Sequence, residues 1–203
     1  MKIANYVRSI KFARILSTLF VSPSFTILVF IYFAFALETS VINRIVLIST
    51  ALTFGFAFHI IFFFYLRKKG ALADGDASIK EERSLPYLVA ILFYALGLII
   101  IVYFKINIIS LAFWFCYITN TSFIFLINRK WKISAHTMGA GGPLAAITYV
   151  LGPLGLIFVI LLMAIGWARV KLKLHSISQV VAGALLGFFS TYLQMYLIIH
   201  YFS

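Results

Sequence analysis

The sequence predicts an all-α protein, a polytopic transmembrane bundle of six to seven membrane segments that forms one integral membrane domain over residues 1–203. Of these residues, 64% are hydrophobic and only 11% are charged, which excludes a soluble domain of this size. The apolar residues form continuous runs, and runs of about 18 or more are typical of membrane-spanning helices. Because the bilayer core admits only helices or a closed barrel, continuous rather than alternating runs favour helices.

The first half of the chain contains a basic arm and two apolar segments. The arm covers residues 1–14. An apolar run at 15–37 follows it, so residues 15–40 are predicted to form an extra N-terminal segment. The core of the protein is then expected at 41–203. A signal peptide is the alternative for this run, because Ala34 and Ala36 fit a cleavage site, but about 20 apolar residues is long for one. A second segment is expected at 41–66, before a polar stretch that holds four of the five acidic residues.

The second half contains four apolar regions, predicted at 86–104, 108–127, 136–169 and 180–201. The third is too long for one crossing, and Gly152-Pro153 in its middle is a strong turn signal. Each half is about 14 residues, or roughly 21 Å of helix, which is shorter than a hydrocarbon core of about 30 Å. The pattern therefore predicts a short helical hairpin at about 138–168, with a single kinked helix as the alternative.

The charge pattern separates these alternatives. With a hairpin, the N-terminal arm shares one side with the loops 67–85, 128–138 and 168–179, and this side holds 15 of the 17 Lys and Arg residues. A single helix would carry the last group of cations to the far side, against the positive-inside rule. The hairpin is favoured, and the same rule predicts that the basic side faces the cytoplasm.

The net charge of +12 has a different meaning in a membrane protein from the one it has in a soluble protein. It indicates contact with anionic membrane lipids rather than with nucleic acid. A basic site for a phosphorylated substrate is the second interpretation. The single Cys116 cannot form an intrachain disulfide, so it indicates no compartment.

The predicted hairpin brings two histidines to one side, His136 at its start and His175 just beyond its end. The neighbouring polar residues are five cations and one hydroxyl: Lys130, Lys132, Ser134, Arg169, Lys171 and Lys173. Neither loop holds a carboxylate, which disfavours a metal site or a serine hydrolase. Arginine binds phosphate oxygens bidentately, and two imidazoles can supply a nucleophile and an acid, so the cluster suits a phosphate ester. The structural alternative is that these cations snorkel to the interface, and His59 and His200 are assigned no role.

Two motifs carry a resemblance to a known family. The stretch ARVKLKLHSISQVVAGALLG resembles the third motif of the type 2 phosphatidic acid phosphatases, which reads Ser-Arg, five residues, His, three residues, Asp, with Arg169 and His175 in place. The stretch ISAH resembles their second motif, Pro-Ser-Gly-His, with Ser134 and His136 in place. Together with KEERSLP, WKISAH is similar to a compact bacterial branch, and the resemblance covers roughly residues 40–200.

The resemblance implies a lipid phosphatase of the bacterial inner membrane that needs no metal or other cofactor. His175 would be the nucleophile that forms a phosphohistidine, and His136 would protonate the leaving alcohol. Ser134 and Arg169 would hold phosphate oxygens. The substrate would be a lipid phosphomonoester or an isoprenyl diphosphate whose tail lies in the bilayer.

The chain departs from this pattern at three places. Gln179 stands where the family has the aspartate that orients the nucleophile, and its carbonyl can fix the tautomer of the ring without neutralising its charge. Ile133 and Ala135 replace the Pro and Gly of the second motif. The first motif, Lys, six residues, Arg-Pro, is absent, and two stretches offer substitutes: Lys130 and Lys132, or Lys80 and Arg83, of which Arg83 and Lys132 are favoured jointly.

These departures leave a second hypothesis open, a catalytically weak or inactive relative that binds lipid phosphates or has a structural role. A transporter or channel is disfavoured because the segment interiors hold very few ionisable residues. A prenyl-transferring enzyme would need aspartate-rich metal motifs, and Asp74-Gly75-Asp76 is too sparse for one.

Overall fold

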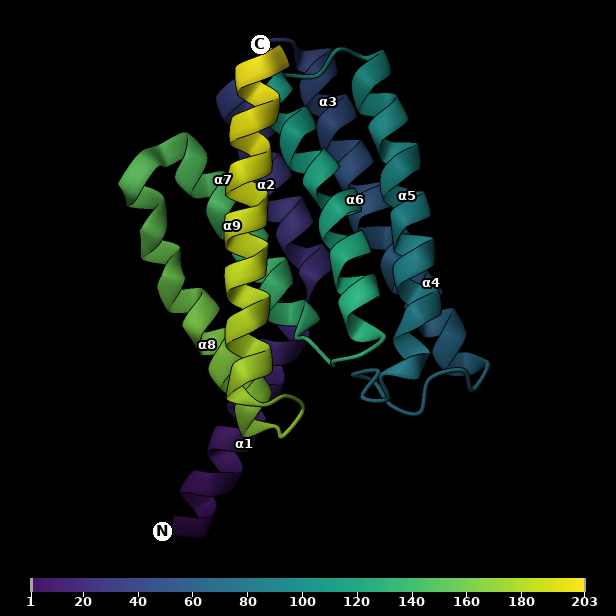
Figure 1. Cartoon of the computed structure of the whole chain (residues 1–203), viewed down its shortest axis with the longest axis vertical. Coiled ribbons are helices and arrows are strands. Elements are labelled where there is room, and N and C mark those ends of the chain that lie inside the picture. The colour runs from purple at the N-terminus through teal and green to yellow at the C-terminus, as the bar shows by residue number, and fades with distance from the viewer. Residues whose placement is uncertain (1, 203) are drawn as a thin grey trace.

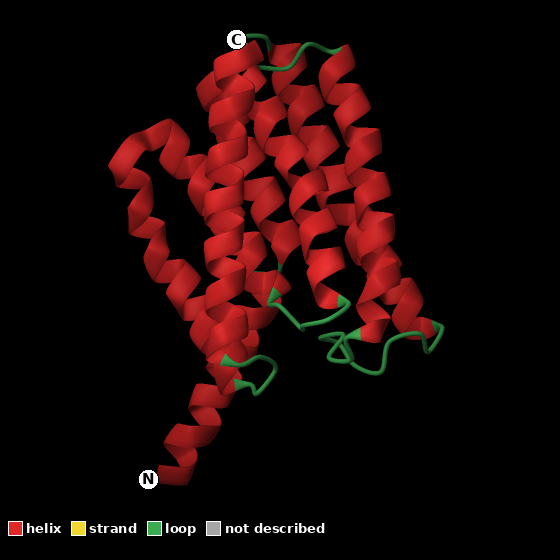
Figure 2. Ribbon diagram, viewed as in Figure 1, coloured by secondary structure: helices red, strands yellow, loops and turns green. Residues whose placement is uncertain are grey.

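The protein is a bundle of helices whose long axes run roughly together (Figure 1). The computed structural model describes residues 2–202, and side chains from residue 6 onward. Lys2 of the predicted basic arm therefore lies outside the described side chains. Figure 2 shows helices joined by short loops, without strands in the described residues. The all-α prediction is confirmed.

The helices follow in the order α1 (Lys2–Leu19), α2 (Ser22–Leu37), α3 (Val41–Thr50), η1 (Ala51–Ala57), α4 (Phe58–Lys68), η2 (Glu81–Arg83), α5 (Ser84–Tyr103), α6 (Ile108–Asn128), α7 (Ala135–Leu151), η3 (Gly152–Phe158), α8 (Val159–Lys171) and α9 (Ile177–Phe202). Five helical stretches of the described chain are long and apolar enough to cross a membrane, or six if α1 and α2 form one bent span. The stretches are Val41–Lys68, Glu81–Tyr103, Ile108–Asn128, Ala135–Lys171 and Ile177–Phe202. The chain is therefore an integral membrane protein, and its outer faces contact membrane lipids.

The N-terminal segment is not the single helix that its apolar run predicts. The chain breaks after Leu19, and Tyr6–Leu19 and Ser22–Leu37 meet at an angle of 56°. Val21 is extended, and Pro23 lies in the first turn of α2, where its fixed φ and missing N–H are tolerated. α1 instead packs against α8, with the rings of Phe12 and Trp167 6.2 Å apart.

The predicted hairpin is confirmed. The chain rises along α7, turns through η3 and descends along α8 to the end where α7 began (Figure 1). Gly152 makes the turn with a φ of 63°, a conformation that costs glycine little. At the base, Lys132 Nζ donates to the Leu174 carbonyl at 3.0 Å, and the Ser134 N–H donates to the Gln179 carbonyl at 3.2 Å. The hairpin therefore brings the two motif-bearing loops together.

The loops divide between the two ends of the bundle as the charge pattern predicts. The N-terminus and the loops 69–80, 129–134 and 172–176 lie at one end, and the loops 38–40 and 104–107 lie at the other with the C-terminus (Figures 1 and 2). The first end carries 15 of the 17 Lys and Arg residues. We refer to it as the basic end.

Glycines let α7 pack directly on its neighbours. A Cβ at Gly141 would lie 2.6 Å from the Ala184 carbonyl oxygen of α9, and one at Gly183 would lie 2.6 Å from the Ser134 carbonyl oxygen. Gly139 faces Ser22 of α2 in the same way, and Gly142 faces Thr191. These contacts place α2 and α9 against the start of α7, where both predicted site residues Ser134 and His136 lie.

Replacing Gly141 by alanine is expected to lower the free energy of unfolding by roughly 1–3 kcal/mol, because the new methyl group meets the backbone of α9 rather than a side chain that can move. Thermal unfolding of the purified protein in detergent measures the loss. Gly75→Ala is the matched control, because the nearest atom to its Cβ is the end of the Arg67 side chain at 3.4 Å. Equal melting temperatures for the two variants would contradict this account of the packing.

Candidate functional site

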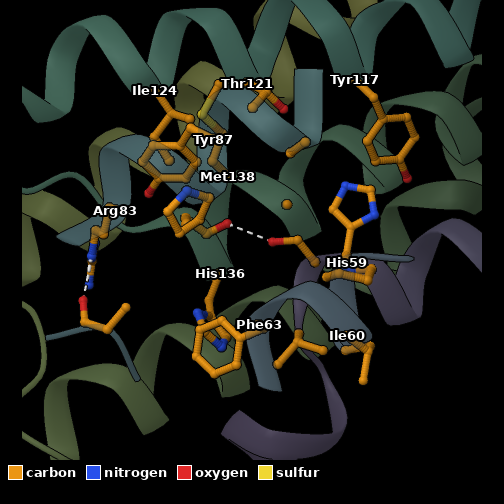
Figure 3. A pocket seen from close by; sticks show the side chains of 18 of the residues that line it. His59, Ile60, Phe63, Arg83, Tyr87, Tyr117, Thr121, Ile124, His136 and Met138 are labelled. Carbon is orange, nitrogen blue, oxygen red and sulfur yellow. Dashed lines mark hydrogen bonds between the residues drawn. The ribbon is translucent and has the colours of Figure 1, made fainter. Parts of the chain in front are cut away.

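A cavity of about 720 Å³ runs from the basic end into the bundle. Its polar and charged lining residues at the basic end include Arg14, Ser17, Arg67, Asp74, Asp76, Arg83, His136 and His175. The rest of the lining is largely aromatic and aliphatic, including Phe62, Phe63, Phe93, Phe113 and Ile124, and Figure 3 shows Phe63 and Ile124 among them. Phe113 lies about 15 residues before the end of α6, or roughly 22 Å along the helix. The cavity therefore joins a charged opening to a deep apolar interior.

His175 lies in the short loop between α8 and α9 and is only 7% exposed. Its Nδ1 is 3.3 Å from Gln179 Oε1, and the same oxygen accepts the N–H of Ser176 at 3.1 Å. Burial, and then the positive charges of Arg83, Arg169 and Lys132, lower the pKa of His175 to about 3. The ring is therefore neutral at physiological pH, and when Nδ1 donates to Gln179 the lone pair is on Nε2.

The two site residues of the second motif, Ser134 and His136, have different surroundings. Ser134 is fully buried, and its hydroxyl accepts the Thr137 N–H at 3.4 Å as the N-cap of α7. It is not among the lining residues in the described part of the chain. His136, two residues later, does line the cavity, and Figure 3 shows it near Met138 of the same helix. The cap thus fixes the start of α7 and the position of the His136 side chain.

Arg169 is completely buried at the end of α8. Its Nη1 donates to Asp76 Oδ1 at 2.8 Å and to Ser17 Oγ at 2.6 Å. Its Nε is buried and has no hydrogen-bond partner within residues 2–202. A buried donor without a partner is costly. Arg169 itself is not among the residues that line the cavity in the described chain; its contact Asp76 is.

Asp76 is the site residue that the sequence interpretation missed. It bridges two cations, Arg169 and Arg14, from the loop between α4 and α5. Burial raises the pKa of this carboxyl, but hydrogen bonds and charge from Arg14 and Arg169 outweigh burial and lower the pKa overall. The clue in the sequence was that acidic residues gather in a polar stretch on the most basic side of the protein. The carboxylate contacts the guanidinium that the sequence analysis predicted to bind a phosphate oxygen.

The four substitutes for the first motif have different surroundings, and Lys130 is exposed and does not line the cavity. Arg83 lines the cavity and is 5% exposed, and its Nε donates to the Ala77 carbonyl at 2.7 Å. Lys132 lies between the loops, and burial together with the charges of Arg83 and Arg169 lowers its pKa. Lys80 does not line the cavity; it donates to the Arg129 carbonyl at 3.1 Å and pairs with Glu81. The structure therefore brings Arg83 to the histidines and leaves Lys80 outside.

Within the described residues, no group of three His, Cys, Asp or Glu side chains comes together in a way that could hold a metal ion. Comparison of the chain with protein-family models, curated proteins and solved structures finds no match.

Replacing Asp76 by asparagine is expected to lower the free energy of unfolding by about 3 kcal/mol, because it leaves the buried Arg169 without its counter-charge. The carboxyl has a lowered pKa in the folded state, so its contribution is complete above the unfolded pKa and disappears as the pH falls through the folded pKa. Thermal unfolding at pH 7 and at lower pH should therefore show a large difference between wild type and Asp76→Asn only at the higher pH.

The control for this variant is Glu81→Gln, which removes a carboxylate from the same end of the protein. The Glu81 side chain is 72% exposed in its ion pair with Lys80, and exposed pairs contribute little. A loss of stability as large in Glu81→Gln as in Asp76→Asn would mean that general charge, and not the Arg169 contact, stabilises the protein.

Proposed function

We propose that this protein is a membrane-embedded lipid phosphatase of the type 2 phosphatidic acid phosphatase kind, acting on a lipid phosphomonoester or isoprenyl diphosphate without a metal. One observation carries the proposal: a single cavity has two imidazoles, His136 and His175, and three arginines, Arg14, Arg67 and Arg83, at its charged opening and an apolar interior behind them. Such a cavity suits a ligand with a phosphate head and a hydrocarbon tail.

In the proposed first step, His175 Nε2 attacks phosphorus and the bond between phosphorus and the lipid oxygen breaks. Gln179 supports this step by accepting a hydrogen bond from the Nδ1–H of the ring, which leaves the lone pair on Nε2. His136 protonates the leaving oxygen. Arg83, together with Arg169 once the phosphate displaces Asp76, stabilises the charge on the non-bridging oxygens.

In the second step, water attacks the phosphohistidine, His136 takes the proton of the water, and the bond between phosphorus and nitrogen breaks. Phosphate leaves and His175 returns to its neutral form. Gln179 carries no charge to balance the imidazolium as it develops, so we expect slower turnover than with an aspartate at this position. Ser134 contributes by holding the start of α7 and, with it, His136.

The alternative proposal is a relative that binds lipid phosphates with little or no turnover. Two observations favour it: an amide orients His175, and a carboxylate is bound to Arg169. Both proposals place the protein in a bacterial inner membrane, with the basic end in the cytoplasm as the positive-inside rule predicts.

A panel of lipid phosphates separates these proposals. The purified protein in detergent would be incubated with phosphatidate, phosphatidylglycerophosphate and an isoprenyl diphosphate, each with and without EDTA. Release of phosphate from at least one of them, unchanged by EDTA, is the expected result. Saturable binding without release at any pH would favour the binding protein, and neither binding nor release would contradict both.

A further inference from the structure

His59 is a partly buried imidazole for which the proposed mechanism has no use. It lies in the first turn of α4 and lines the cavity (Figure 3). Its ring packs against those of Phe93 and Tyr94, with centroids 5.5 and 4.7 Å apart. Both of its nitrogens are buried and make no hydrogen bond to any described residue. Because an unpaired buried polar group is unfavourable, the ring is suited to a polar partner inside the cavity.

A hydroxyl group shares this part of the cavity. Tyr117 lines the cavity, and its hydroxyl is buried beside that of Thr26, which does not line it; neither makes a hydrogen bond of ordinary geometry within residues 2–202. Tyr94 packs against both His59 and Tyr117, at ring separations of 4.7 and 5.1 Å. Figure 3 shows the Tyr117 hydroxyl on the side of its ring nearer His59. The polar tips of His59 and Tyr117 therefore form a small polar patch in an otherwise apolar wall.

The position of this patch relative to the charged opening suggests which ligand atoms reach it. His59 lies about eight residues before Arg67, or roughly 12 Å along the helix, so it is deeper than the basic end but well short of the inner limit of the cavity. In a diacylglycerol phosphate, ester carbonyls follow the phosphate after a few bonds, at the start of the tails. An isoprenyl chain carries no polar atom beyond its phosphate.

We propose that His59 and Tyr117 form a subsite for the ester carbonyl of a glycerolipid phosphate. An imidazole N–H and a phenol O–H both donate to a carbonyl oxygen. The inference rests on the proposed function and narrows its substrate class from lipid phosphates in general to ester-linked glycerolipid phosphates. An isoprenyl chain in the same place would leave the nitrogens of His59 unpaired.

The test compares two ligands that differ only in the carbonyls. Ester-linked dioleoyl phosphatidate and its diether analogue have the same phosphate and tails of the same length. The unmodified protein in detergent should bind the ester lipid about 3- to 10-fold more tightly, the ratio expected for one or two neutral hydrogen bonds. An isoprenyl phosphate should bind less tightly than the ester lipid. Binding is measured by fluorescence titration and phosphate release is measured separately.

Variants then assign the preference to named side chains. His59→Leu should remove most of the preference for the ester lipid by weakening its binding, and should not weaken binding of the diether lipid. Tyr117→Phe should remove part of the preference. Phe63→Leu is the control, because it changes the apolar lining of the same cavity and should alter the binding of both lipids equally.

Equal binding of the ester and diether lipids by the unmodified protein would overturn the subsite while leaving a lipid phosphatase intact, and this comparison needs no variant to fold. Retention of the full preference in both His59→Leu and Tyr117→Phe would also overturn it. If no lipid phosphate is bound or hydrolysed, the proposed function itself fails, and the subsite fails with it.

Discussion

Phosphate release is expected to fall by on the order of 10³-fold or more when His175 is replaced by alanine, because the proposed reaction forms its covalent intermediate on this side chain. His175 contacts Gln179 through its side chain, so its loss should leave the bundle folded. The measurement is phosphate release from the best lipid phosphate of the panel, in EDTA and at saturating substrate.

His200→Ala is the matched control for His175→Ala. His200 lies in the last turn of α9 at the end of the bundle away from the cavity, where its ring stacks on Tyr196. It should retain full activity. Full activity in His175→Ala would remove His175 from the mechanism, and loss of activity in both variants would indicate a general effect on folding.

Replacing Arg169 by lysine is expected to have the second largest effect, a fall in phosphate release of roughly 10²- to 10³-fold. Lysine keeps the charge but not the planar fork that can bind two acceptors at once. In the structure, this fork contacts Asp76 and Ser17 and keeps its Nε unpaired within the described chain. Phosphate release and thermal unfolding should both be measured, because the buried contacts also stabilise the protein.

Arg129→Lys is the control for the effect on activity. Arg129 follows α6 at the same basic end, where its guanidinium lies over the Phe125 ring 4.8 Å from the centroid, and it does not line the cavity within the described residues. The contrary outcome is a folded Arg169→Lys protein that keeps an activity within about twofold of wild type. That result would contradict a role for the guanidinium in phosphate binding.

The sequence predicted the topology well because topology depends on features that are local. Apolar runs mark the spans, Gly152-Pro153 marks the turn of the hairpin, and the cations gather at one end. The break between α1 and α2 was missed because the apolar run continues through it. Pro23 marks the start of α2 locally, and the packing of α1 on α8 gives α1 its direction. Hydropathy alone does not record a change of direction.

The sequence predicted contacts in the site correctly where two residues are one helix turn apart. It predicted few of the contacts between distant residues. Gln179 was expected to lie one turn beyond His175, and this spacing is local. The Asp76 contact joins residues 93 positions apart, so no spacing rule could identify it. Arg83 and Lys80 are three residues apart, yet one lines the cavity and the other faces the loop at Arg129. The local turn at η2 decides which of them reaches the histidines, and sequence alone does not give its orientation.

The family resemblance predicted an acid at position 179, and the structure places a different acid, Asp76, in the same cavity as His175. This carboxylate, one that lines the cavity, is bound to arginines rather than to His175. It therefore cannot orient the nucleophile as an aspartate at position 179 would. The chemistry we propose depends on whether an amide is sufficient for that task.

The central claim is that His175 carries phosphate during turnover, and trapping the intermediate tests it most directly. The purified protein would be mixed with a lipid phosphate labelled with radioactive phosphorus, in EDTA, and quenched within a single turnover. We predict a label on the chain that is stable to base, labile to acid as phosphohistidine is, and absent from His175→Ala. Phosphate release by wild type without such a label, or an equal label on His175→Ala, would contradict the mechanism.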